Sequence, residues 1–224
     1  PVRPKLHTKP AGKDWVTFND ECWRNLRTWD IYIIDGQRGP RVAPGTYTVT
    51  LKVGERTFVQ NLEVLKDPNS GASAADIQKQ VAFALDCRDQ LNHTVGLINN
   101  IELLRSELEA FEGSGKSKES EALAQLRDEA LAIAAQLYDV NLTGAREDAF
   151  RSPMKVYGRL AAVAADINGS GIDFPPTDQQ EGVYEVLSER VKVAQEAYKK
   201  FVDMSVPAFN KKFGAQIGRS VMKP

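Results

Sequence analysis

A short glycine-rich stretch, Gly113-Ser114-Gly115-Lys116-Ser117, contains the residue types that cradle phosphates in nucleotide-binding loops. Such a loop requires another glycine five residues before Gly115, where this chain has Ala110, and it must follow a strand. Here a long helical pattern precedes the stretch. We therefore interpret it as a flexible turn between two helices and not as a nucleotide site.

The other residues that could do chemistry form no catalytic or metal-binding pattern. His7 and His93 are the only histidines, and His93 lies off the apolar positions of its predicted helix. The Glu-x-x-His pair of di-iron helical bundles is absent, and no spacing assembles Ser, His and Asp into a triad. We therefore expect no catalytic residue, no metal site and no cofactor, and we do not expect this chain alone to be an enzyme.

Two cysteines, Cys22 and Cys87, are too few for a disulfide scaffold. Cys87 falls on the apolar positions of the longest predicted helix, which predicts a buried free thiol. A Cys22–Cys87 bridge remains open if the two halves of the chain meet there.

Three tryptophans, Trp15, Trp23 and Trp29, are the candidate contact residues for a ligand or partner. Exposed tryptophans on a small sheet bind sugars or anchor protein interfaces. The alternative is that they are core or domain-interface residues, and the sequence leaves both open.

Composition and charge exclude several classes of protein. The 224 residues include 29 basic and 30 acidic side chains, for a net charge of −1, which argues against a dedicated nucleic-acid or anionic-membrane binder. No apolar run approaches the roughly 18 residues of a transmembrane span, and no signal peptide is present. Because the chain begins with Pro1, its natural start is expected to lie elsewhere.

The first third of the chain is predicted to form strands. Polar and apolar residues alternate from Thr46 to Val53 and again from Thr57 to Leu65, which predicts a hairpin with a three-residue loop. Trp15 to Phe18 and Thr28 to Ile34 are further strand candidates because aromatic and β-branched residues favour strands. Together these segments predict a three- or four-stranded antiparallel unit.

From Ser73 onward the pattern predicts four helices. The first runs from Ser73 to Glu112, with Ser73 and Asp76 as a capping pair, and its apolar stripe must be covered by partner helices. The second helix is predicted over Lys118 to Val140, and the third begins at Ser152-Pro153. The fourth is capped by Thr177 and is expected to kink or end at Pro207. The stripe of the first helix comprises Ile77, Val81, Ala84, Cys87, Leu91, Val95, Ile98, Ile101, Leu104, Leu108 and Phe111.

These elements predict an α+β fold. A small antiparallel β unit, resembling part of an Ig-like domain, is expected over residues 1–68. An antiparallel four-helix bundle with one long helix is expected over 73–213, and a loose tail over 214–224.

Several stretches between Arg27 and Phe213 carry a resemblance. They are Trp29-Asp30-Ile31-Tyr32, Gly39-Pro40, Pro44-Gly45-Thr46-Tyr47-Thr48-Val49, Asp67-Pro68, Ser152-Pro153-Met154, Pro176-Thr177 and Val206-Pro207-Ala208. Together they resemble the C-terminal region of large bacterial proteins with a sortilin-type, BNR-repeat β-propeller, which are often described as glycosyl hydrolase-like. The propeller is absent from this chain, and no matching position is catalytic.

The resemblance implies a non-catalytic accessory or interaction module of a larger extracellular, periplasmic or envelope protein, with an upstream β-propeller or another protein as partner. One alternative is a glycosidase-like enzyme to which this chain contributes carbohydrate binding through its tryptophans. Another is a helical oligomerisation protein in which the long helix pairs between chains.

Overall fold

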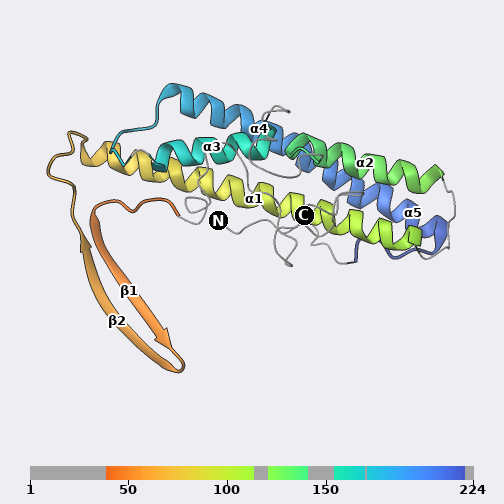
Figure 1. The fold of residues 1–224 in the computed structure, drawn as a ribbon, viewed down its shortest axis with the longest axis horizontal. Helices are drawn as coiled ribbons and strands as arrows, with labels where there is room; N and C mark the ends of the chain where they lie inside the picture. Colours follow the sequence, from red (N-terminus) through yellow and green to blue (C-terminus); the bar gives the residue numbers. More distant parts are fainter. Residues whose placement is uncertain (1–38, 114–120, 141–153, 170, 220–224) are drawn as a thin grey trace, which may run out of the picture.

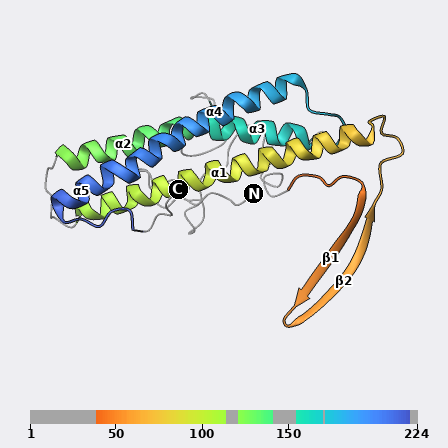
Figure 2. The same cartoon turned by 180° about the vertical axis from the view of Figure 1, so that it is seen from behind.

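A computed structural model of the chain describes residues 39–113, 121–140, 154–169 and 171–219. In these ranges two antiparallel strands are followed by helices, so the predicted α+β class is confirmed. Figure 1 shows an elongated helical body and a strand pair that projects from one end of it. The view from behind in Figure 2 shows the same separation between strands and helices.

The strand pair is a long hairpin of β1 (Gly45–Val53) and β2 (Arg56–Val64). Val53 pairs with Arg56, so the loop has two residues, and the predicted three-residue loop is wrong. Gly54 opens the loop with a φ of 61°, and a positive φ at this position is what two-residue hairpin turns require. The other predicted strands, Trp15 to Phe18 and Thr28 to Ile34, lie outside the described residues, as does most of the predicted unit 1–68.

The long first helix, α1 (Ala74–Gly113), begins and ends within a residue of its predicted bounds. Its 40 residues span about 60 Å. The predicted cap is present, because the Ser73 amide donates to Asp76 Oδ2 at 3.1 Å and the Asp76 amide donates to Ser73 Oγ at 3.1 Å. The Ser73 hydroxyl also donates to Asp76 Oδ2 at 2.6 Å, and this bond, together with the one from the Ser73 amide, lowers the pKa of Asp76 below its ordinary value.

Two shorter helices, α2 (Glu121–Leu137) and α3 (Val156–Gly169), both run antiparallel to α1. They lie one after the other along it, with α3 near the hairpin end and α2 at the far end (Figure 1). Met154 and Lys155 are not helical, so the predicted start of α3 at Ser152-Pro153 is wrong. The backbone carbonyl of Lys155 instead accepts the first hydrogen bond of α3, from the Arg159 amide.

The last long helix, α4 (Asp178–Lys200), runs parallel to α1 and packs against both α2 and α3. Thr177 caps it as predicted, in a reciprocal pair of hydrogen bonds with Gln180. Near the hairpin end the body is therefore built from α1, α3 and α4, and farther along from α1, α2 and α4.

A π-helical turn, Phe201–Ser205, joins α4 directly to α5 (Val206–Phe213). The Val206 amide bonds the carbonyl of Phe201, five residues back, in place of the usual four. Pro207 explains this widening, because its ring would clash with the carbonyl four residues earlier in a regular helix. The predicted kink or end at Pro207 thus takes the form of a local change of helix type.

Residues 214–219, part of the predicted loose tail, fold back on the helices. Ile217 is buried, and its amide and carbonyl bond the side chain of Asn210. The Gly218 amide donates to Glu107 of α1. This part of the tail is therefore fixed to the body at three points.

The core is divided along the length of the body. One cluster joins the C-terminal half of α1 to α2, the end of α4 and α5, around Ile101, Leu137 and Phe201. Two smaller clusters join the N-terminal half of α1 to α3 and the start of α4, around Cys87, Leu160 and Leu187. The chain's own helices thus cover the long stripe that the sequence predicts to need partners.

Candidate functional site

The three tryptophans proposed from the sequence, Trp15, Trp23 and Trp29, all lie outside the described residues, and so does Cys22. Their role as contact residues therefore stays a prediction. The Cys22–Cys87 bridge that the sequence left open is not formed, because Cys87 is a free thiol. The turn Gly113-Ser114-Gly115-Lys116-Ser117 stays a prediction beyond its first residue.

Cys87 is a free thiol with no exposed surface, as the sequence predicts. Burial, and to a smaller extent the nearby charge of Asp86, raises its pKa to about 12. A thiol that stays protonated at neutral pH is a poor nucleophile and a poor metal ligand. Cys87 is therefore a core residue.

His93 is exposed and bonds Gln195 of α4, with 3.1 Å between Nε2 and Oε1. Within the described ranges, no three His, Cys, Asp or Glu side chains gather in a way that would hold a metal ion. In the same ranges no helix is long and apolar enough to cross a membrane.

Buried polar groups in the body serve its packing. Glu102 is 1% exposed and accepts a short hydrogen bond from the hydroxyl of Tyr138, which follows α2. The hydroxyl of Thr94 donates to the carbonyl of Gln90 in the same helix. The hydroxyl of Tyr198 lies in the main core without a hydrogen-bond partner among the described residues. Burial raises its pKa to about 12.

An exposed apolar surface lies on one face of the hairpin. Opposite residues in an antiparallel pair point to the same side, so the register Leu51–Phe58 and Tyr47–Leu62 gathers apolar residues on one side. We call this the apolar face, and its apolar residues are Tyr47, Val49, Leu51, Val53, Phe58, Leu62 and Val64. Gln60, paired with Val49, and Arg56, paired with Val53, lie on the same side. Leu51 is 59% exposed and Phe58 54%.

The opposite side of the hairpin is polar apart from Val59. It carries Thr46, Thr48, Thr50, Lys52, Thr57, Asn61 and Glu63. A one-sided pattern of this kind is typical of a strand pair that covers a core with one face and meets water with the other. In the described structure neither strand packs against a helix, so the helical body does not cover the apolar face.

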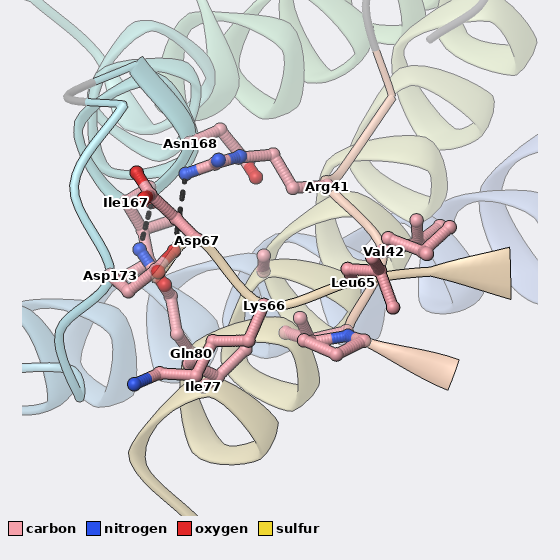
Figure 3. A pocket seen from close by; sticks show the side chains of 14 residues that line it. Arg41, Val42, Leu65, Lys66, Asp67, Ile77, Gln80, Ile167, Asn168 and Asp173 are labelled. Atoms are coloured by element: carbon pink, nitrogen blue, oxygen red, sulfur yellow. Dashed lines mark hydrogen bonds and ion pairs between the residues drawn. The ribbon is translucent and has the colours of Figure 1, made fainter. Parts of the chain in front are cut away.

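A pocket of about 200 Å³ lies where the hairpin meets the body. Figure 3 shows Arg41 and Val42, before β1, and Leu65 and Lys66, after β2, on one side of it, with Ile77 and Gln80 of α1 and the end of α3 on the other. This volume is below the usual range of sites for small organic ligands. The pocket is therefore better described as the joint between hairpin and body.

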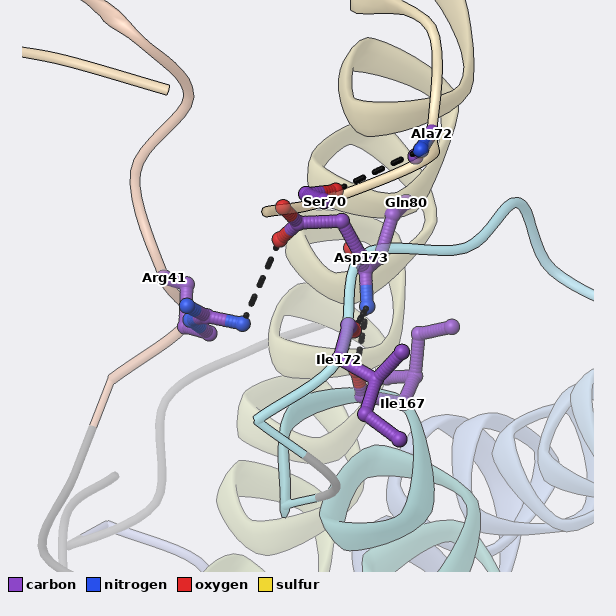
Figure 4. Close-up of polar contacts among 7 residues, drawn as sticks. All are labelled: Arg41, Ser70, Ala72, Gln80, Ile167, Ile172 and Asp173. Atoms are coloured by element: carbon purple, nitrogen blue, oxygen red, sulfur yellow. Dashed lines mark hydrogen bonds and ion pairs between the residues drawn. The ribbon is translucent and has the colours of Figure 1, made fainter. Parts of the chain in front are cut away.

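Polar contacts at this joint are few (Figure 4). Arg41 Nη1 lies 3.5 Å from Asp173 Oδ1, and the Arg41 side chain is 50% exposed. Gln80 Nε2 donates to the carbonyls of Ile167 and Ile172, at 3.1 Å each, which fixes the turn after α3 against α1. An exposed ion pair contributes roughly 0–1 kcal/mol. The hairpin is thus held at its base, while its length stays clear of the helices.

The backbone around the base also positions the strands. Ala43 is buried, and its carbonyl accepts a 2.6 Å hydrogen bond from the hydroxyl of Tyr47. After β2, Lys66 Nζ donates to the carbonyl of Ser70, and the Asn69 amide donates to Asp67. Both connections are therefore locally structured, and this directs the hairpin away from the body.

The apolar face and the joint are the surface features of the described residues that stand out. The apolar face offers shape and hydrophobic area, and Arg56, paired with Val53 at its tip, adds a charged group on the same side. Sequence reasoning predicted the alternation that builds this face but not its exposure.

Comparisons with protein-family models, with curated proteins and with solved structures found no match.

Proposed function

We propose that this chain is a non-catalytic interaction module, in which the helical body holds the hairpin so that its apolar face docks on a partner. The exposed apolar face is the observation that carries the proposal. Five of its side chains, Val49, Leu51, Val53, Phe58 and Leu62, are each 47–59% exposed. Covering the rest of such a side chain contributes roughly 1 kcal/mol, so together they could support docking.

The shape of this face suggests the partner's architecture. Alternating valine, leucine and aromatic side chains on a twisted strand pair pack best against another sheet face, about 10 Å away. We therefore propose a β-sheet domain outside these 224 residues as the partner. The resemblance noted in the sequence would make this an upstream β-propeller or Ig-like segment of a secreted or envelope protein, and that identification is part of the proposal.

A paired set of variants tests this function. Leu51→Lys with Phe58→Lys places two charges at directly paired positions of the apolar face. Thr48→Lys with Asn61→Lys does the same on the polar side and serves as the control. The readout is the size of the native assembly in extracts of the cells that make the protein, followed with an antibody to this chain.

The wild type and the control are expected in an assembly larger than the chain's 24.8 kDa accounts for. The L51K/F58K variant is expected to leave that assembly while its helix content and melting temperature stay unchanged, because neither strand packs on a helix. If both variants behave like the wild type, the apolar face is not a docking surface and the proposal is wrong.

A further inference from the structure

The outer side of α4 carries a second apolar stripe that no described element covers. Val183, Val186 and Val193 are 46%, 53% and 51% exposed, and Met204 after the π-helical turn is 62% exposed. We call these four residues the outer stripe. Together with Arg190, the first three follow a spacing of three, four and three residues, so they lie along one line of the helix.

This spacing is that of a helix-pairing seam. The buried side of α4 also has residues at spacings of three and four, namely Leu187, Val191, Ala194 and Tyr198. These residues pack on the other helices of the body. Single exposed apolar residues are normal on protein surfaces, but Val183, Val186 and Val193 occupy three of four positions on one line, with Arg190 at the fourth, and this pattern is typical of helices that pair. The outer stripe spans about 30 Å of helix.

The charges on α4 indicate what could cover the stripe. The half from 178 to 189 has four acidic residues and no basic one: Asp178, Glu181, Glu185 and Glu189. The half from 190 to 200 has four basic residues and one acidic one: Arg190, Lys192, Lys199, Lys200 and Glu196.

The helix dipole accounts for only part of this separation. It favours acids in the first turn and bases in the last turn, and its effect does not extend to the middle of a helix. Glu185, Glu189, Arg190 and Lys192 lie in the middle of α4. Within α4, Glu189 has only a long 3.7 Å contact with Lys192, in which both side chains are well exposed.

We propose that the outer stripe of α4 pairs with the same stripe of a second copy of this chain, in antiparallel orientation. In that orientation the acidic half of each α4 lies along the basic half of the other, while the valines meet between them. A parallel pairing would place like charges together. A twofold axis near residues 189 and 190 relates the copies, as in most homodimers.

This pairing is distinct from the docking of the hairpin. The outer stripe lies on α4, and the apolar face lies on strands that do not pack against α4. A single helix pair gives an interface at the small end of stable interfaces, so we expect a dimer whose population rises through the micromolar range.

Sedimentation equilibrium of the full chain over this concentration range tests the proposal. The expected result is a transition from 24.8 kDa to twice that mass. Val186→Glu with Val193→Glu should remove the dimer without changing helix content, because both side chains are half exposed. Leu131→Glu, at an exposed position of α2, is the matched control and should still dimerise.

Charge variants test the orientation argument. Glu185→Lys with Glu189→Lys removes the net negative charge of the half from 178 to 189, which leaves the basic half of the other copy without an acidic partner, and should weaken self-association at least tenfold. Arg190→Glu with Lys192→Glu makes both halves acidic and should do the same, while an equal mixture of the two variants should associate again. A wild type that stays monomeric at high micromolar concentration would overturn the proposal, and so would a V186E/V193E variant that still forms the dimer.

Discussion

At the scale of single residues, two tyrosines at the same core, the buried Tyr198 and the half-buried Tyr138, have opposite hydrogen-bond environments. The Tyr138 hydroxyl donates to the buried carboxyl group of Glu102, whereas the Tyr198 hydroxyl has no partner in the described structure. Leaving a buried polar group unpaired costs about 1–3 kcal/mol, and losing one member of a buried pair costs a similar amount. Replacing tyrosine by phenylalanine is therefore expected to have different effects on the free energy of unfolding at the two positions.

We predict that Tyr198→Phe leaves the free energy of unfolding unchanged or raises it by up to about 1 kcal/mol, because it removes an unpaired hydroxyl without creating a cavity. Tyr138→Phe should lower it by roughly 1–3 kcal/mol, because the buried carboxyl group of Glu102 loses this donor. Urea denaturation of both variants measures the difference. A Tyr198→Phe variant that is the less stable of the two would contradict this account of the core.

Cys87 gives a second prediction at this scale. In a Cys22→Ser background it is the only thiol, and burial raises its pKa to about 12 from an ordinary value of 9.0. Because the folded-state pKa is raised, this group's contribution to stability is complete below pH 9 and is lost as the pH rises toward 12.

We expect Cys87 in that variant to resist a thiol reagent at pH 8 in the folded protein and to react at once after denaturation. Alkaline titration should then show reactivity appearing only as the fold is lost. Rapid reaction of the native protein at pH 8 would mean that the thiol is accessible, which the structure excludes.

At the scale of elements, the π-helical turn between α4 and α5 behaves as a one-residue insertion. The buried residues Ala194, Tyr198, Phe201, Val206 and Phe209 follow one another at spacings of four, three, five and three. The spacing of five between Phe201 and Val206 is one residue longer than a regular helix face allows. The extra residue is absorbed in the turn, so both flanking segments keep their apolar residues in the core.

Deleting the exposed Asp203 in a Pro207→Ala background should therefore convert the turn into regular α-helix and keep Phe201 and Val206 in phase. We predict a melting temperature within a few degrees of the P207A parent, measured by circular dichroism. Deleting Glu189 from the middle of α4 in the same background is the control and should abolish cooperative unfolding, because it turns every later residue by about 100°. Equal effects of the two deletions would contradict the insertion model.

Helix starts were predicted correctly where they depend on a cap formed by residues that are close in the sequence. The caps at Ser73–Asp76 and Thr177–Gln180 are present, because a capping box needs only residues three positions apart. The start of α3 was predicted wrongly from Ser152-Pro153, since a favourable serine–proline pair does not oblige the chain to begin a helix there.

The buried polar residues of α1 could not be predicted, because their partners are far away in the sequence. Gln80 bonds carbonyls 87 and 92 residues later, and Glu102 bonds a tyrosine 36 residues later. The predicted stripe also omitted Phe83 and Leu97, which are buried because α1 meets α3 along one half and α2 along the other. A single stripe does not describe a helix whose partners change along its length.

At the scale of the whole molecule, the chain combines a helical body that buries its own apolar residues with a hairpin that leaves one apolar face exposed. The three core clusters belong to the helices, while the strands place one apolar face in solvent. The hairpin and its two-sided pattern were predicted from the sequence. The tryptophans proposed as contact residues lie outside the described residues. The apolar face was missed as a candidate site because the exposure of a strand depends on what packs against it, which alternation alone does not reveal.

Site-specific photo-crosslinking in the cells that make the protein tests the central claim most directly. A photoreactive phenylalanine replaces Phe58 on the apolar face, or Thr57 on the polar side as the control. The docking account predicts crosslinks from position 58, and not from position 57, to a β-sheet domain outside these 224 residues. Crosslinks from position 58 only to residues 1–38 or to the helices of the same chain, or equal yields from both positions, would contradict it.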